Sequence, residues 1–385
     1  MPSPDDPHLA TLLSAAFSDS GSVTPPIYQT SLYTFDSYQA FEDRLNGRST
    51  DPLYSRIQNP TVSAFEELTA KAEQGEAAVG FASGMAAISS TLLAFLRPGD
   101  RLAVTEHVYS DAYRLFEQLL RPFGIDITYH ALSALENDPA LLKGTKIAYV
   151  ETANSLMLQP ANLPKIAANA KAHGTLTVTD NSWASPAFQR PLNHGIDIVL
   201  HSASKYISGH SDTVAGVVVG SQPLIGTIRQ LTLPLLGAKL APFEAWLLVR
   251  GLRTLDARMR QHQATADLFV DRLAARPEVK KLHSPGANSV PGLTGRAGLL
   301  SIELADSVDI PRLADALKLF RLGVSWGGFE SLILPIRAGL GQPGADSAAQ
   351  RFGVPKNLVR LSLGLENPSD LWADFEAALN ASTTG

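Results

Sequence analysis

The densest group of reactive side chains in the sequence lies around Lys205. Ser202 and Ser204 precede this lysine, and a short apolar run at 197–201 precedes them. Alternate residues of a strand point to the same side, so the two hydroxyls are expected on one face. A lysine at the end of a buried strand lies where open α/β sheets bind their ligands. The segment predicts a phosphate held beside an amine, although a surface lysine in a polar loop explains it equally well.

A carboxylate at Asp180 adds to this prediction. It follows the apolar run at 176–179 and stands 25 residues before Lys205, so the two can lie on neighbouring strands. An aspartate after a strand is also a common helix cap. A pyridine nitrogen that must stay protonated needs an acidic partner of this kind, as in enzymes that use pyridoxal phosphate.

Two further segments carry matching chemistry. Ser83-Gly84-Met85 opens a predicted helix, where free backbone N–H groups can bind an anion, although a plain turn has the same composition. Tyr109 follows the run at 101–105 and could stack on an aromatic ring or lie half-buried in the core. Taken with Lys205 and Asp180, these residues predict pyridoxal 5'-phosphate bound through a lysine Schiff base. Without Asp180 they would fit a simple phosphorylated metabolite.

The elements that must position these residues alternate between strand and helix. Short apolar runs between helical stretches predict a mainly parallel sheet with helices on both faces. The expected strands are 101–105, 146–150, 176–179, 197–201 and 215–220, and the expected helices are 60–74, 83–97, 111–121 and 163–173. A continuous helix at 243–276 is expected to lead into a smaller α/β domain with strands at 299–304 and 358–363 and helices at 310–321 and 369–379.

We therefore expect three parts in the chain. Residues 1–55 form an arm, 56–245 the large cofactor-binding domain, and 246–385 a linker helix with the smaller domain. The arm holds many prolines and interspersed aromatic residues. Because an arm this apolar is poorly solvated, it is expected to pack on its own body or on a partner subunit.

Composition excludes several classes of function. The chain has 385 residues, with 32 Lys and Arg against 37 Asp and Glu, giving a net charge of −5. This balance argues against a nucleic-acid partner. Cysteine is absent, which excludes disulfides, thiolate metal sites and a catalytic cysteine, and no metal site is expected. No targeting segment or stretch of about 18 apolar residues is found, so we expect a soluble, cytoplasmic protein without membrane contact.

Five motifs in this order resemble the Cys/Met-metabolism family of pyridoxal-phosphate-dependent enzymes. The motifs are Tyr54-Ser55-Arg56, Asn59-Pro60-Thr61, the segment 81–88, Asp180-Asn181, and Ser202 to Asp212. The resemblance runs from about residue 20 to the C-terminus. It implies the fold of aspartate aminotransferase (fold type I): a large, mainly parallel sheet domain and a smaller C-terminal α/β domain.

The resemblance also implies a role for each matching residue. Lys205 would carry the cofactor and move protons, Asp180 would pair with the pyridine nitrogen, and Tyr109 would stack on the ring. The phosphate would be bound by Gly84, Met85, Ser202, Ser204 and, from a neighbouring subunit, Tyr54 and Arg56. Arg360 would bind the α-carboxylate of an amino-acid substrate in a bidentate pair. A homo-oligomer with shared active sites, expected to be a tetramer, follows.

Two departures from the family pattern bear on the reaction. An Asn that often follows the Glu of the 151–155 segment is replaced by Ser155, with Asn154 one place early, so its contact is unassigned. In the loop at 324–332, γ-acting members carry Glu and Leu where this chain has Val324 and Trp326. Ser325-Trp326 followed by two glycines resembles the β-acting branch, which cleaves cystathionine to homocysteine, pyruvate and ammonia. A γ-acting enzyme, a broader β-lyase for S-substituted cysteines and an idle cofactor-binding protein are the alternatives.

Overall fold

The structure, a computed structural model, describes residues 7–15, 21–340 and 348–383. Its larger sheet has the strand order β1-β7-β6-β5-β4-β2-β3. The strands are Ala77–Phe81 (β1), Arg101–Thr105 (β2), Asp126–His130 (β3), Ile147–Glu151 (β4), Leu176–Asp180 (β5), Ile198–Ser202 (β6) and Gly216–Gly220 (β7). The strands from β3 to β6 run parallel, whereas β7 is antiparallel to both β6 and β1. The expected mainly parallel sheet is confirmed.

Helices cover both faces of this sheet because its strands bury side chains on both sides. Val217 and Val219 of β7 join one hydrophobic cluster, and Val218 between them joins another. The first face is covered by Pro60–Glu73 (α3), Leu163–His173 (α7) and Pro242–Arg253 (α11), and the second by Gly84–Phe95 (α4), Ser110–Leu115 (α5), Phe116–Leu120 (η1) and Gln222–Gln230 (α9). Shorter helices complete the connections: Leu132–Asn137 (α6), Pro139–Leu142 (η2), Ser185–Phe188 (α8), Pro191–His194 (η3) and Thr232–Leu236 (α10).

The expected continuous helix at 243–276 is wrong in one respect, because it breaks at Thr254. The structure has α11 and then Leu255–Leu273 (α12), with Thr254 at φ −107° and ψ 3° between them. At the break, the Arg258 guanidinium donates to the Gly251 carbonyl at 2.7 Å and to the Tyr206 carbonyl at 2.7 Å. A side chain at Gly251 would collide with the backbone of the segment after Lys205. The break therefore lets the helix pair lie against the lysine-bearing segment.

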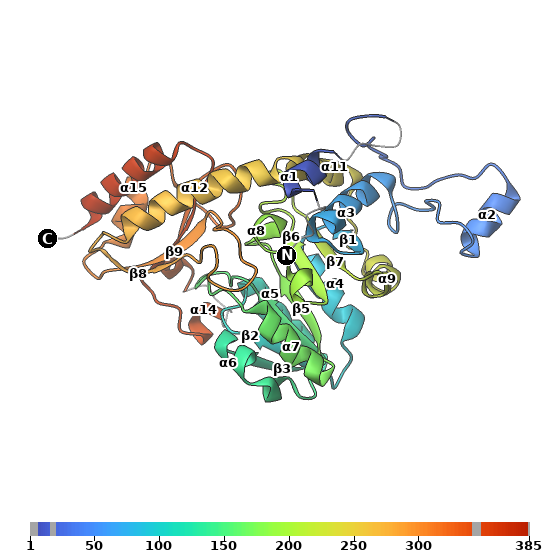
Figure 1. The fold of residues 1–385 in the computed structure, drawn as a ribbon, viewed down its shortest axis with the longest axis horizontal. Coiled ribbons are helices and arrows are strands. Elements are labelled where there is room, and N and C mark those ends of the chain that lie inside the picture. The colour runs from blue at the N-terminus through green and yellow to red at the C-terminus, as the bar shows by residue number, and fades with distance from the viewer. Residues whose placement is uncertain (1–6, 16–20, 341–347, 384–385) are drawn as a thin grey trace.

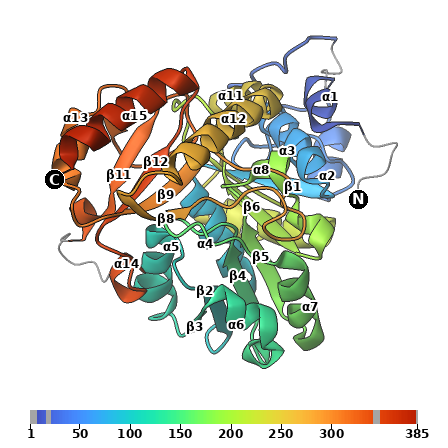
Figure 2. The same cartoon turned by 60° about the vertical axis from the view of Figure 1, so that its left-hand side comes forward.

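A second sheet forms the C-terminal part, in the order β10-β11-β12-β9-β8. Its strands are Val279–His283 (β8), Leu299–Leu304 (β9), Arg321–Leu322 (β10), Leu332–Pro335 (β11) and Leu358–Ser362 (β12). It packs in a separate hydrophobic cluster with α12, Ile310–Ala316 (α13) and Pro368–Ser382 (α15), and Figure 2 shows these helices beside it. The short Ile336–Gly339 (η4) and Ala348–Arg351 (α14) lie between β11 and β12 in the chain. The second sheet thus has its own core, whereas Leu248, Leu252 and Met259 of the helix pair pack in a core of the large sheet.

The expected helix at 310–321 ends early, at Ala316. The Asp374 carboxylate of α15 accepts hydrogen bonds from the backbone N–H groups of Lys318, Leu319 and Phe320. These groups are thereby satisfied outside a helix, so the chain can leave helical conformation at Leu317.

The arm has two halves with different surroundings. Leu9–Ser14 (α1) packs against α3, α11 and α12, and its Leu13 side chain is fully buried. Tyr38–Leu45 (α2) buries none of its residues and extends away from the body in Figure 1. Residues 1–6 and 16–20 of the expected arm lie outside the described residues. Among the described helices, none combines the length and apolar character that a membrane crossing requires.

Candidate active site

Three strand ends bring the predicted site together. Asp180 is the last residue of β5, and it pairs with Glu151 at the end of β4 and with Leu200 of the neighbouring β6. Ser202 ends β6, and Lys205 follows within one turn. Because these strands are parallel, their carboxyl ends lie at one edge of the sheet. Asp180 therefore ends one strand, and Lys205 lies in the turn that follows the neighbouring strand.

The Lys205 amine is partly buried, and its surroundings lower its pKa. Its Nζ donates to the Ser325 Oγ and lies 5.6 Å from the centroid of the Trp326 ring. Burial and the positive charge of Arg360 lower the pKa of Lys205 to about 8, against the opposing effect of Asp180. An amine with this pKa is neutral in an appreciable fraction near neutral pH, as a nucleophile or proton acceptor must be.

Two buried carboxyl groups lie side by side near this lysine. Asp180 accepts a hydrogen bond from the Ser182 N–H at 2.8 Å. Burial raises the pKa of Asp180, while hydrogen bonds from Ser182 and the nearby His201 and Lys205 lower it. Glu151 has no such cations, and burial together with the Asp180 charge raises its pKa well above the ordinary value. Burial is the largest effect on both groups and raises both pKa values, while the nearby cations favour the carboxylate form of Asp180.

Glu151 is a residue of this site to which the sequence assigned no role. Its Oε1 accepts a hydrogen bond from the Tyr109 N–H at 2.8 Å and so fixes the start of α5. Tyr109 itself is 39% exposed, and its hydroxyl donates to Asp111 at 3.1 Å. Burial and the neighbouring Asp111 raise the pKa of Tyr109 to about 12. The available signal was the position of Glu151 at the end of a buried strand, level with Asp180.

The N-terminus of α4 forms an anion cradle next to β6. The Ser83 hydroxyl accepts a hydrogen bond from the Ala86 N–H at 3.0 Å, and the Ser83 carbonyl accepts one from the Ala87 N–H. Within the described residues, nothing accepts from the Gly84 and Met85 N–H groups. A methyl group on Gly84 would lie 2.8 Å from the Ser202 Cβ and would close this space. Two free donors therefore point from a helix start beside the Ser202 hydroxyl.

Ser204 differs from Ser202 in its surroundings. Its hydroxyl donates to the Ala215 carbonyl at 3.2 Å and accepts from the Ala215 N–H at 3.0 Å. Its single proton is thus used within the chain, where it joins the segment after β6 to the start of β7. The structure brings Ser204 near the cradle but gives its hydroxyl an internal partner.

Arg360 brings a buried cation to the site from β12. Its guanidinium donates to the Ser155 carbonyl at 3.3 Å and to the Ser325 carbonyl at 3.1 Å. Burial lowers the pKa of Arg360 to about 10. Because no carboxylate of the described residues pairs with it, this guanidinium can donate hydrogen bonds to the carboxylate of a bound molecule. Asn154, by contrast, pairs with Gln159 through both its amide nitrogen and its amide oxygen.

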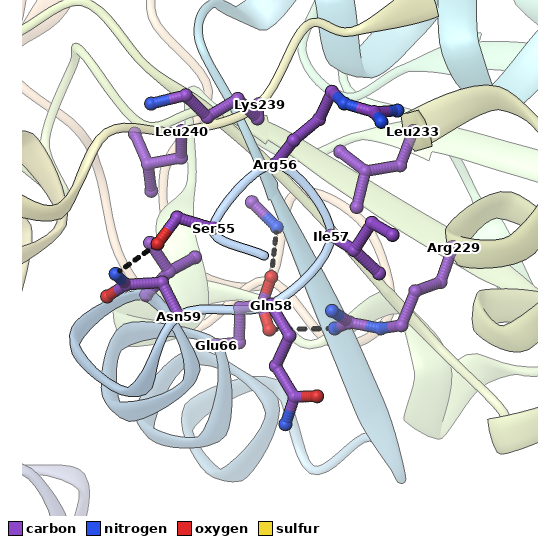
Figure 3. Close-up of a pocket in the computed structure, with 12 residues that line it drawn as sticks. Ser55, Arg56, Ile57, Gln58, Asn59, Glu66, Arg229, Leu233, Lys239 and Leu240 are labelled. Carbon is purple, nitrogen blue, oxygen red and sulfur yellow. Dashed lines mark hydrogen bonds and ion pairs between the residues drawn. The ribbon is translucent and has the colours of Figure 1, made fainter. Parts of the chain in front are cut away.

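The arm residues Tyr54 and Arg56 are not brought to Lys205 within this chain. The Arg56 guanidinium donates to the Pro234 carbonyl at 2.7 Å and lies 5.6 Å from the centroid of the Tyr54 ring. Figure 3 shows Arg56 extending toward Leu233 at the rim of a small hollow that also holds the Glu66–Arg229 ion pair. Tyr54 and Arg56 thus form a group separate from the strand-end cluster.

Comparison with known proteins agrees with this geometry. Residues 11–380 match the family described as Cys/Met metabolism PLP-dependent enzymes. An L-methionine gamma-lyase from Pseudomonas putida is 37% identical over 372 residues, covering 94% of each chain. A cystathionine beta-lyase from Lactococcus lactis is 36% identical over 367 residues, covering 93% of this chain and 94% of its own. The crystal structure of cystathionine gamma synthase from Xanthomonas oryzae superposes with a TM-score of 0.89 at 34% identity, covering 98% and 99% of the two chains.

The fold and the strand-end cluster define a pyridoxal-phosphate-dependent enzyme of fold type I. More narrowly, the chain belongs to the Cys/Met metabolism family of these enzymes, and pyridoxal 5'-phosphate is its cofactor.

Proposed function

We propose that this enzyme is a carbon–sulfur lyase that converts L-cystathionine to L-homocysteine, pyruvate and ammonia, the reaction of a cystathionine β-lyase in methionine biosynthesis. The cofactor fits the residues that the structure places at the strand ends. Its phosphate would take the free Gly84 and Met85 N–H groups with the Ser202 hydroxyl, and its ring nitrogen would face Asp180. Tyr109 would lie over the ring, and Lys205 would bind the aldehyde carbon.

When bound, pyridoxal phosphate supplies an electron sink for charge that develops at the substrate Cα. Asp180, whose carboxylate form is favoured by Ser182 and the nearby cations, would hold the ring nitrogen protonated. Arg360 would bind the substrate α-carboxylate and so orient the Cα–H bond. Its guanidinium already lies beside the Ser325 carbonyl, which places this anchor next to Lys205.

Proton movements would depend on Lys205. Its amine would take the Cα proton, and the electron pair left at Cα would form a double bond to Cβ. The Cβ–S bond then breaks with its electrons passing to sulfur. Lys205 or the Tyr109 hydroxyl, whose pKa of about 12 keeps its proton in place, would protonate that sulfur. The three-carbon product takes up water to give pyruvate and ammonia.

One observation carries the choice of β-elimination. Ser325 accepts a hydrogen bond from Lys205, and the Trp326 ring packs on Tyr206 in a tilted arrangement with centroids 5.3 Å apart. The preceding Val324 is 76% exposed and offers no carboxylate to the site. γ-Elimination needs a second proton removal, at Cβ, and therefore a mobile base with room to move. A lysine held by Ser325 beside a bulky ring fits the single proton removal of β-elimination better.

A γ-elimination is the second candidate, because the Pseudomonas putida relative is an L-methionine gamma-lyase and is as similar as the Lactococcus relative. Product identification with L-cystathionine separates the two. We expect pyruvate with homocysteine, whereas 2-oxobutyrate with cysteine would assign the γ-reaction. Pyruvate from L-cystine or S-alkyl cysteines at rates that exceed the rate with cystathionine would instead indicate a broad cysteine-S-conjugate β-lyase.

A further inference from the structure

The loop at 325–331 lies directly on the segment that follows Lys205. A methyl group on Gly327 would lie 3.0 Å from the Tyr206 amide nitrogen and 3.2 Å from the Lys205 carbonyl carbon. One on Gly328 would collide with the Ser211 hydroxyl and the Glu330 carboxylate. The two glycines thus allow the loop of the C-terminal part to approach the backbone of the large domain closely.

Glu330 bridges these two segments at the end of the loop. Its Oε1 accepts a hydrogen bond from the Ser211 Oγ at 2.6 Å, between residues 119 positions apart. Its Oε2 is shielded from solvent and accepts no hydrogen bond from any residue that the structure describes. Shielding half of a carboxylate in this way costs free energy. Glu330 is therefore not expected to stabilise the fold. Its hydrogen bond with Ser211 is the better explanation for a carboxylate at this position.

One of the other links between the loop and the lysine segment involves a group that must change during the reaction. Lys205 has to leave the Ser325 hydroxyl whenever it takes or gives a proton, and Trp326 packs on Tyr206, the residue next to Lys205. The Ser211–Glu330 hydrogen bond involves neither the lysine nor its neighbour. It can persist while the Lys205–Ser325 contact opens and closes.

We propose that Glu330 is a positioning residue, which acts through Ser211 to keep Ser325 and Trp326 in place against Lys205. The inference deepens the proposed function, because β-elimination was argued from the placement of this loop. It predicts that loss of the Ser211–Glu330 hydrogen bond changes the surroundings of the lysine nitrogen even before substrate is added.

The test uses the holoenzyme without substrate. The pH titration of the visible absorbance of the bound cofactor reports the proton on the lysine nitrogen. For Glu330→Ala we expect its midpoint to shift by on the order of half a unit. With cystathionine, kcat/KM should fall about tenfold, as for a lost hydrogen bond to a charged group. Glu330→Gln keeps an acceptor oxygen for Ser211 and should remain close to the parent enzyme in both measurements.

Ser211→Ala removes the same hydrogen bond from the other side and should shift the midpoint equally. The double variant should show the same midpoint and the same kcat/KM as Glu330→Ala alone, because both changes remove the same hydrogen bond. Thr177→Val is the matched control. It removes a hydroxyl–carboxylate hydrogen bond of 2.7 Å to Asp197 at the amino ends of β5 and β6, whereas Lys205 follows the carboxyl end of β6. It should lower Tm without moving the midpoint.

An unchanged midpoint in Ser211→Ala would overturn the proposal, as would fully additive losses in the double variant. The Ser211→Ala titration tests the proposal even if Glu330→Ala does not fold. These outcomes are separate from a failure of the proposed function, which product identification in the parent enzyme decides.

Discussion

The strand-end cluster around Lys205 differs from the arm, with the adjoining Arg56, in how many of its side chains find partners within one chain. Around Lys205, side chains from both sheets meet: Asp180 and Glu151 from the large one, Arg360 from the smaller one. Along the arm, large apolar side chains remain exposed, namely Val23, Ile27, Tyr28, Leu32, Tyr38, Phe41, Leu45 and Tyr54. Arg56, meanwhile, is occupied by a carbonyl of its own chain. One chain therefore brings the residues of the cluster together, whereas the arm leaves its apolar side chains exposed, and we propose that a neighbouring subunit covers them.

This difference supports a division of labour within a homo-oligomer. The strand-end cluster would hold the cofactor ring and the substrate, while Tyr54 and Arg56 of a neighbouring subunit would reach the phosphate. Variants of the two regions should therefore behave differently.

The largest effect is expected for Lys205→Ala. It removes both the attachment point of the cofactor and the base that takes the Cα proton, so turnover should fall by roughly 10²–10⁴-fold or more. The visible absorbance that depends on the lysine–cofactor bond should also disappear. A purified variant that retains both the absorbance and the turnover would show that another residue holds the cofactor.

Arg360→Ala should be the next most damaging change. A charge-assisted pair with the α-carboxylate contributes on the order of 1.5–3 kcal/mol, so kcat/KM should fall at least about tenfold. Arg360→Lys should recover only part of this loss, because an ammonium cannot make the two-pronged contact. The product should be the same in both variants. Full recovery by lysine in steady-state kinetics would contradict a bidentate role.

The arm is tested by hybrid oligomers. Arg56→Ala alone should weaken cofactor retention, measured as loss of visible absorbance on dilution. Mixed with Lys205→Ala, it should regain some activity, because one site of a hybrid dimer then holds both intact residues. The control is each variant incubated alone in the same way. Demonstrated subunit exchange without any regained activity would rule out shared sites.

The lowered pKa of Lys205 gives a pH prediction for the apoprotein. Only the neutral amine attacks the cofactor aldehyde, so the rate of cofactor binding should rise with pH and level off above about 8. An exposed lysine would keep gaining rate up to its ordinary pKa of about 10.4. Stopped-flow absorbance measures this rate. A rate that continues to rise toward pH 10 would mean that burial does not lower the pKa of Lys205.

The smallest expected change concerns the product ratio. Trp326→Leu combined with Val324→Glu removes the bulky ring and adds a carboxylate beside Ser325, which should move the products from pyruvate toward 2-oxobutyrate. Chromatography of the two keto acids measures the ratio. If it stays constant while β-activity remains intact, the choice of reaction is made outside this loop.

Much of the framework could be predicted from the sequence because it depends on local patterns. The strand Arg101–Thr105, the helix Leu163–His173 and the strand Leu299–Leu304 have the expected bounds. A short apolar run defines each strand, and helical periodicity that ends before Gly174 defines the helix. The same patterns placed Asp180 and Lys205 at the ends of neighbouring strands.

What could not be predicted depends on partners far away in the sequence. The helix break at Thr254 follows from the packing of Gly251 and Arg258 on the segment after Lys205. The early end of α13 follows from the Asp374 carboxylate of another helix. Likewise, the hydrogen bond from the Tyr109 N–H to Glu151 joins residues that are 42 positions apart in the sequence. No local pattern contains this information.

The buried Arg258 also affects how tightly the cofactor can bind. Its guanidinium binds the Tyr206 and Gly251 carbonyls together, so it ties the lysine-bearing turn to the helix pair with bonds that involve no cofactor atom. The turn therefore has its working shape before loading. Little ordering entropy is then lost at this turn when pyridoxal phosphate arrives, and more of the contact energy is available as affinity. In this respect the apoprotein is a preorganised receptor for its cofactor.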